Sequence, residues 1–91
     1  MTTAEQIKNR LQTLAPLSLD LTDDSAAHAG HAGARSGGGH FHLRIVSAAF
    51  AGQSKVQRHR LVYEALGDLM QKEIHALGIE ALAPDEARRR L

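Results

Sequence analysis

Histidine is the residue type in this sequence whose abundance points to chemistry. The chain of 91 residues contains no cysteine and six histidines, which are His28, His31, His40, His42, His59 and His75. Imidazole nitrogen binds zinc, copper, nickel and iron, so histidines that come together are candidate metal ligands. Without cysteine the chain forms no disulfide and supplies no thiolate. The composition therefore excludes a thiolate metal site built by this chain alone.

Two places in the chain are the stronger candidates for a metal site. His28 and His31 lie in a stretch rich in glycine and alanine, where they form either a loosely held ligand pair or part of a solvated loop. A zinc site usually needs three or four ligands at fixed spacing, which this pair does not supply. His59 lies about one helical turn before Val62, at the edge of an apolar helix face. There it either packs or binds a metal, and the spacing leaves both interpretations open.

A basic group falls within the first two turns of a predicted helix and consists of Lys55, Arg58 and Arg60. Helix N-termini carry free backbone donors and the positive end of the dipole, which favours a nucleic-acid phosphate. The alternative is an ordinary solvated helix start, because two phenylalanines and one tyrosine offer little surface for base stacking. The sequence has no nucleophile elbow, phosphate loop or close acid pair, so we expect a protein that is not an enzyme.

Length and charge limit the class of protein. The length predicts a single domain over residues 1–91. Lysine and arginine number 11 against 10 aspartates and glutamates, a formal charge of +1, which argues against a whole surface that binds nucleic acid. No apolar run approaches the roughly 18 residues of a membrane span, and the N-terminus lacks the layout of a signal peptide. We therefore expect a soluble, cytoplasmic protein that does not bind membranes.

Helical periodicity predicts the elements that hold these residues. The first helix has an apolar stripe made of Ile7, Leu11 and Leu14. Thr2 with Glu5, or Thr3 with Gln6, fits its capping box, and Pro16 ends it. A second and longer helix over 54–73 has apolar positions at Val62, Ala65, Leu66, Leu69 and Met70.

Alternating patterns predict three strands. Leu17, Leu19 and Leu21 alternate with polar residues, which indicates a strand with one buried face. A flexible loop follows over 23–39, and a second strand then directs Phe41, Leu43 and Ile45 inward. The third strand covers 75–83, and Pro84 begins a closing helix.

The predicted order is α-β-β-α-β-α, which defines an α+β fold with a three-stranded sheet and helices on one face. The first two strands are expected to pair antiparallel, and the partner of the third strand stays open. Opposite the helices the sheet would present polar side chains to water, namely Asp20, His42, Arg44 and Glu80.

Several strings of this sequence resemble the signature of the BolA family. The most specific are Phe50-Ala51-Gly52 and the stretch from Val56 to Tyr63, which contains Arg58-His59-Arg60. The resemblance extends over nearly the whole chain, to His40-Phe41, Ile74-His75-Ala76-Leu77, Pro84-Asp85-Glu86 and the Asp23-to-His28 stretch that is similar to the variable loop of the family. It implies a fold similar to the class II KH domain.

The resemblance also implies a partner and a cofactor. Members pair with monothiol glutaredoxins that carry a CGFS motif, and the heterodimer shares a two-iron two-sulfur cluster held by the glutaredoxin cysteine, a glutathione thiolate and the BolA-like chain. On this basis His59 matches the histidine ligand of the family, and His28 is the loop ligand, with His31 competing. The implied role is iron–sulfur assembly, trafficking or iron regulation. The free chain is expected to be a monomer or weak homodimer.

A DNA-binding transcriptional regulator is the alternative that the resemblance implies. KH domains clamp the nucleic-acid backbone with a G-x-x-G loop. The turn here reads Gly52-Gln53-Ser54-Lys55, so the second glycine is missing. Phosphate contacts would then depend on Lys55, Arg58 and Arg60.

Overall fold

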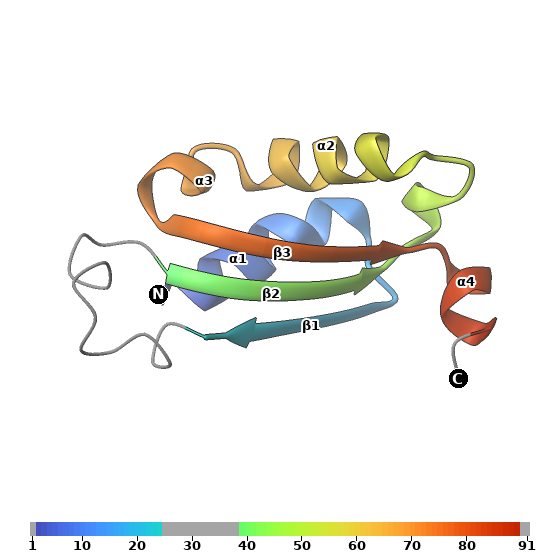
Figure 1. Cartoon of the computed structure of the whole chain (residues 1–91), viewed down its shortest axis with the longest axis horizontal. Helices are drawn as coiled ribbons and strands as arrows, with labels where there is room; N and C mark the ends of the chain where they lie inside the picture. The colour runs from blue at the N-terminus through green and yellow to red at the C-terminus, as the bar shows by residue number, and fades with distance from the viewer. Residues whose placement is uncertain (1, 25–38, 90–91) are drawn as a thin grey trace.

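The computed structural model describes residues 2–24 and 39–89 (Figure 1). Helices and strands follow one another as α1 (Thr3–Leu11), β1 (Ser18–Asp23), β2 (Gly39–Val46), α2 (Lys55–Leu66), α3 (Leu69–Lys72), β3 (Ile74–Leu82) and α4 (Pro84–Arg89). Short 3-10 helices follow α1 at Gln12–Leu14 and β2 at Ala48–Phe50. The predicted α+β class and element order are confirmed.

The sheet has the order β1-β2-β3, with β2 in the centre. β1 pairs antiparallel with β2, as expected, and β3 pairs parallel with β2, which settles the partner that the sequence left open. α1 and α2 cover one face of the sheet (Figure 1). On the other face Asp20 pairs in register with Arg44, and Arg44 lies 3.4 Å from the Glu80 carboxylate, so the predicted polar face is confirmed.

The core lies between the two helices and the sheet. Phe41, Leu43 and Ile45 of β2 are buried, as their alternation predicted, and Phe50 is fully buried beside them. Leu19 and Leu21 of β1 pack partly against this core, but Leu17 is 71% exposed. The prediction that Leu17 shares the buried face is therefore wrong, because the residue precedes the first position of β1.

The capping boxes of α1 and α2 set where these helices begin. Thr2 caps α1 and exchanges hydrogen bonds with Glu5, which decides between the two boxes that the sequence allowed. The first hydrogen bond, donated by the backbone N–H of Thr2, lowers the pKa of Glu5. Ser54 caps α2 in the same manner, with Gln57 as its partner. The start of α2 is thus fixed at the basic group of the sequence.

The expected loop over 23–39 is wrong at both of its ends. Asp23 is the last residue of β1 and Gly39 the first residue of β2. The backbone N–H of Asp24 donates to the carbonyl of His40 at 2.7 Å, which extends the pairing of these strands. Residues 25–38, with His28 and His31, lie outside the described residues.

The single long helix predicted over 54–73 is interrupted, which corrects that expectation. α2 ends at Leu66, Gly67 adopts φ +57° and ψ −131°, and α3 begins at Leu69. Side chains rarely tolerate this backbone conformation, so glycine is needed here. Arg10 of α1 donates to the Leu66 carbonyl at 3.0 Å and to the Asp68 carboxylate at 3.1 Å, which ties the break to α1.

Replacing Gly67 with alanine is expected to cost about 1–3 kcal/mol in the free energy of unfolding. The new Cβ would be strained by the positive φ and would lie 3.1 Å from the Arg10 guanidinium. Gly52→Ala is the matched control, since Gly52 has φ +75° with no atom within 4 Å of a built Cβ. Urea denaturation should find the larger loss for Gly67→Ala. Equal losses of unfolding free energy in the two variants would show that the close approach to Arg10 does not destabilise Gly67→Ala.

Candidate functional site

Two histidines that the sequence left unassigned lie together at one end of the sheet. The ring centroids of His40 and His75 are 4.9 Å apart, with the planes tilted by 39°. His40 comes at the start of β2 and His75 at the start of β3. Because parallel neighbours begin at the same end of a sheet, residues that open both strands meet there. His75 is exposed and His40 half-buried, so the pair is accessible to a ligand.

The same end of the sheet receives both ends of the segment 25–38. Asp24 is hydrogen-bonded to His40, and the backbone N–H of Gly39 donates to the carbonyl of Glu73 at 2.9 Å. The segment that carries His28 and His31 therefore leaves and rejoins the described chain beside the His40–His75 pair. Placement of the two segment histidines themselves lies outside the described residues.

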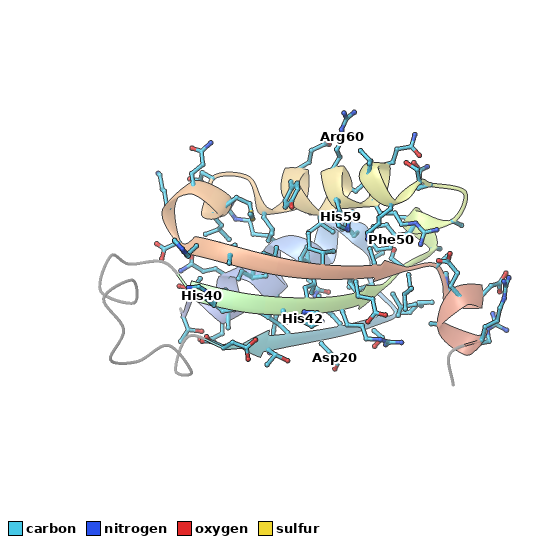
Figure 2. All side chains as sticks on the ribbon, viewed as in Figure 1. Asp20, His40, His42, Phe50, His59 and Arg60 are labelled. Carbon is cyan, nitrogen blue, oxygen red and sulfur yellow. The ribbon has the colours of Figure 1, made fainter. Side chains whose placement is uncertain are left out.

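His59 lies elsewhere, on the side of α2 that faces β3 (Figure 2). It is half-buried and lines a groove of about 470 Å³ together with residues of β3 and with the side chains of Lys55, Arg58 and Glu86. Its ring meets Tyr63 edge-on at a centroid distance of 6.4 Å. The sequence left open whether His59 packs or binds a metal. The contact with Tyr63 supports packing, and metal binding by His59 stays a prediction.

The position of His75 relative to the groove that contains His59 can be counted along β3. His75 and the first groove residue of this strand, Ile79, are four residues apart, or roughly 13 Å at the rise of a strand. His75 therefore lies outside the set of residues that line the groove with His59. Within residues 2–24 and 39–89 no group of three or more potential ligands surrounds a common point. A metal site at either position would need further ligands from elsewhere.

Arg58, which the sequence offered as a phosphate contact, is held inside the domain. Its guanidinium donates to the carbonyls of Gln53 at 2.9 Å and Ala81 at 3.0 Å, and to both oxygens of Glu86 at 2.6 and 3.2 Å. Its side chain is only 13% exposed. Arg58 thereby joins the turn before α2, the end of β3 and α4. Lys55 and Arg60, in contrast, are exposed (Figure 2 shows Arg60).

Glu86 makes stability depend on pH in acid. The Arg58 guanidinium, and then the Ala83 backbone N–H at 2.7 Å, lower the pKa of Glu86 below its ordinary 4.5. A lowered pKa stabilises the fold above the ordinary value, and this contribution disappears as pH falls through the lowered pKa. We expect Glu86→Gln to be less stable than wild type near neutral pH and to lose less stability on acidification.

Thermal unfolding between about pH 7 and about pH 3 at low salt measures this difference. Arg58→Met is the control background, in which Glu86→Gln should change the pH dependence less than in wild type, because only the Ala83 N–H then lowers the pKa of Glu86. If the melting temperature of Glu86→Gln fell with pH as steeply as that of wild type, the role of this ion pair would be contradicted. Some slope is expected to remain, because Arg10 and Lys72 similarly lower the pKa of Asp68.

His42 has a structural explanation that needs no ligand. Its ring lies across Gly78 of β3, so close that a Cβ at Gly78 would stand 2.8 Å from the His42 Nδ1 atom. The absence of a side chain at Gly78 thus leaves room for the ring on the open face of the sheet. His42 stays outside the candidate metal site.

The fold is that of a small α+β protein with a three-stranded mixed sheet, and a pair of histidines lies at one end of that sheet. The sequence model of one family, described as BolA-like protein, matches residues 11–86. This chain belongs to the BolA family. Within the described residues, no helix has the length and apolar character required to cross a membrane.

The relatives include proteins of several kinds. The chain is 46% identical over 87 residues to SufE-like protein 1, chloroplastic/mitochondrial, of Arabidopsis thaliana, which covers 89% of the chain and 24% of that protein. It is 43% identical over 77 residues to BolA-like protein 1 of Mus musculus, covering 85% and 54%. It is also 37% identical over 71 residues to the DNA-binding transcriptional regulator BolA of Haemophilus influenzae, covering 78% and 66%. The chain thus spans between a quarter and about half of the first two relatives.

Solved structures agree with the fold. The BolA domain of SufE1 from Arabidopsis thaliana has a TM-score of 0.79 and 43% identity, with 94% of this chain and 96% of that chain covered. The solution structure of BolA1 from Mus musculus has a TM-score of 0.80 and 38% identity, covering 99% and 72%. The sheet and helices described above are therefore those of BolA structures.

Proposed function

We propose that this chain is a non-enzymatic partner of a monothiol glutaredoxin and shares a two-iron two-sulfur cluster with it in a heterodimer. The role would be cytoplasmic iron–sulfur assembly, trafficking or iron regulation. Membership of the BolA family supports the class of function. The observation that carries the ligand assignment is the His40–His75 pair beside both ends of the segment that contains His28 and His31.

The available donors fit one side of such a cluster. The chain offers imidazole nitrogens and no thiolate, so it would bind one iron while the glutaredoxin cysteine and glutathione supply sulfur to the other. Imidazole ligation raises the reduction potential of the cluster and makes binding depend on pH. When bound, the cluster would be cargo or a signal that the heterodimer carries.

The ends of the segment 25–38 favour His75 over His59 as the ligand outside the segment. Asp24 is hydrogen-bonded to His40, so the segment leaves the described chain beside the His40–His75 pair. The groove that contains His59 begins at Ile79, farther along the sheet and across the edge of β3. His59 with His28 or His31 remains the competing ligand set.

The proposal is tested by mixing the purified chain with a monothiol glutaredoxin, glutathione, iron and sulfide without oxygen. We expect a stoichiometric heterodimer whose visible absorption and circular dichroism differ from those of the glutaredoxin homodimer. The chain without glutaredoxin is the control and should hold no stable cluster. A homodimer spectrum that does not change on addition of the chain would contradict the proposal.

DNA binding is the second candidate, favoured by the similarity to a relative named as a DNA-binding transcriptional regulator. Since Arg58 is engaged inside the domain, phosphate contacts would rest on Lys55 and Arg60. Each phosphate contact contributes a slope of roughly −0.9 to a plot of log affinity against log salt concentration. Two such contacts therefore predict a slope of roughly −1.8. Arg60→Ala should reduce the slope by about one contact. A slope that Lys55→Ala and Arg60→Ala leave unchanged would contradict this assignment.

A further inference from the structure

The groove beside His59 runs along the outer edge of β3. Its lining includes Ile79, on the helix face of the strand, and Glu80, on the opposite face. Since residues of both faces border it, the groove follows the edge of the strand. α2 forms the other wall and runs beside β3 in the opposite direction (Figure 1).

The backbone of β3 directs hydrogen-bonding groups into this groove. The Leu82 carbonyl accepts from Ser47, which places it on the β2 side, whereas the Ala81 carbonyl accepts from Arg58 on the outer side. Backbone groups alternate between the two edges of a strand, so those of Leu77 and Ile79 point outward as well. Within the described part of the chain no strand lies on that side of β3. An edge of this kind is a template for a further strand.

The floor and wall of the groove offer apolar surface. Positions on the helix face of β2, such as Leu43 and Ile45, are fully buried, but Leu77 and Ile79 on the same face of β3 are only half-buried. α2 therefore leaves β3 incompletely covered. Along the wall, one flank of α2 presents residues four positions apart, which are Lys55, His59 and Tyr63. Tyr63 is 42% exposed.

Some charged side chains of the groove form ion pairs among the described residues of the domain and one does not. Arg58 is paired with Glu86, and Glu80 with Arg44. Lys55, at the end of the groove near Ala81, has no ion-pair partner among residues 2–24 and 39–89. The positive charge of Lys55 is therefore the one available to a ligand.

We propose that this groove binds an extended acidic peptide of a protein partner, which adds a strand to the outer edge of β3. Its main chain would pair with Leu77 and Ile79, its apolar side chains would pack on Ile79 and Tyr63, and its carboxylates would meet Lys55. Arg58 already occupies the Ala81 carbonyl, so pairing stops there and the acidic end extends past it. Antiparallel addition, the slightly more stable arrangement, places the N-terminal end of the peptide at Lys55.

Peptide fits this groove better than nucleic acid. The outward donors and acceptors of β3 match a peptide main chain, which supplies both kinds of group at the spacing of a strand. The site is separate from the His40–His75 pair and does not depend on the cluster proposed above.

The probe is a synthetic peptide of about eight residues, with aspartates at its N-terminal end followed by alternating valine and threonine. It is added to the full isotope-labelled chain without iron, and amide shifts and fluorescence anisotropy are recorded. We expect shifts concentrated at 77–81 and on the Lys55–Tyr63 flank of α2. Methylation of the peptide nitrogens that face β3 should weaken binding at least about fivefold, because each loses a main-chain hydrogen bond.

Lys55→Glu should weaken binding of the aspartate peptide at least about fivefold and strengthen binding of a version with lysines in place of aspartates. Lys8→Glu on α1 is the matched control and should change the affinity less than about twofold. Equal binding of the methylated peptide, or shifts outside the groove, would overturn the proposal. A single-stranded oligonucleotide that occupies the same residues more tightly than the peptide would overturn it as well.

Discussion

His75→Ala is expected to lower the affinity of the proposed heterodimer for its cluster at least about tenfold, whereas His59→Ala should leave it within about twofold. The difference follows from the positions of the two rings. His75 contacts His40 beside the residues that flank the segment 25–38, while His59 lies in a groove that begins roughly 13 Å farther along β3. Titration of the glutaredoxin complex, followed by visible circular dichroism, measures both affinities.

His75→Cys is the second variant of this experiment, since it keeps a ligand at the same position. It should retain the cluster and lower its reduction potential, because thiolate ligation gives lower potentials than imidazole. His42→Ala serves as the control, since this histidine lies across Gly78 on the open face of the sheet. Loss of the cluster in His59→Ala with retention in His75→Ala would contradict the assignment and favour the ligand set that the family resemblance implied, His59 with His28 or His31.

The contact between His40 and His75 could not be predicted from the sequence, for a physical reason. His40 and His75 are separated by 35 positions, and only the parallel register of β2 and β3 brings their rings to 4.9 Å. Periodicity assigns a residue to a face of one strand but does not say which strand lies beside it or in which direction that strand runs. The observation that both histidines open a predicted strand was available, and it becomes informative once the strands are known to be parallel.

Local sequence patterns predicted the structure correctly where interactions between nearby residues determine it. Alternation identified the buried residues of β2, and Ser54 caps α2 as its residue type suggests. The same approach missed the break at Gly67, because Leu69 and Met70 continue the helical period beyond it. Arg10 fixes this break from α1, at a sequence distance of more than fifty residues. Contacts of this kind override a periodic pattern.

Arg58 shows why the role of a charged residue could not be predicted from the sequence. In the sequence it belongs to a basic group with Lys55 and Arg60, which predicted a phosphate contact. In the structure its guanidinium makes hydrogen bonds to three other elements, with Glu86 lying 28 positions away. A charge run shows which residues can bind an anion, but the chain itself supplies the anion that binds Arg58.

Arg58→Ala is expected to cost about 2–3 kcal/mol in the free energy of unfolding. The substitution removes the donor from the carbonyls of Gln53 and Ala81, which lie at a partly buried site, and releases α4 from the end of β3. Arg60→Ala is the matched control, because Arg60 is exposed on the outer side of the same helix and should change stability by less than about 0.5 kcal/mol.

Arg58→Lys separates the charge of the side chain from its geometry. Lysine keeps the charge but cannot bind Glu86 through two parallel hydrogen bonds while also reaching two carbonyls, so an intermediate loss is expected. Urea denaturation measures the three variants, and hydrogen exchange of the α4 amides reports where the fold loosens. Arg58→Ala as stable as Arg60→Ala would contradict the structural role. Arg58 would then return to the group of residues available to bind phosphate, because its internal hydrogen bonds would contribute nothing to the fold.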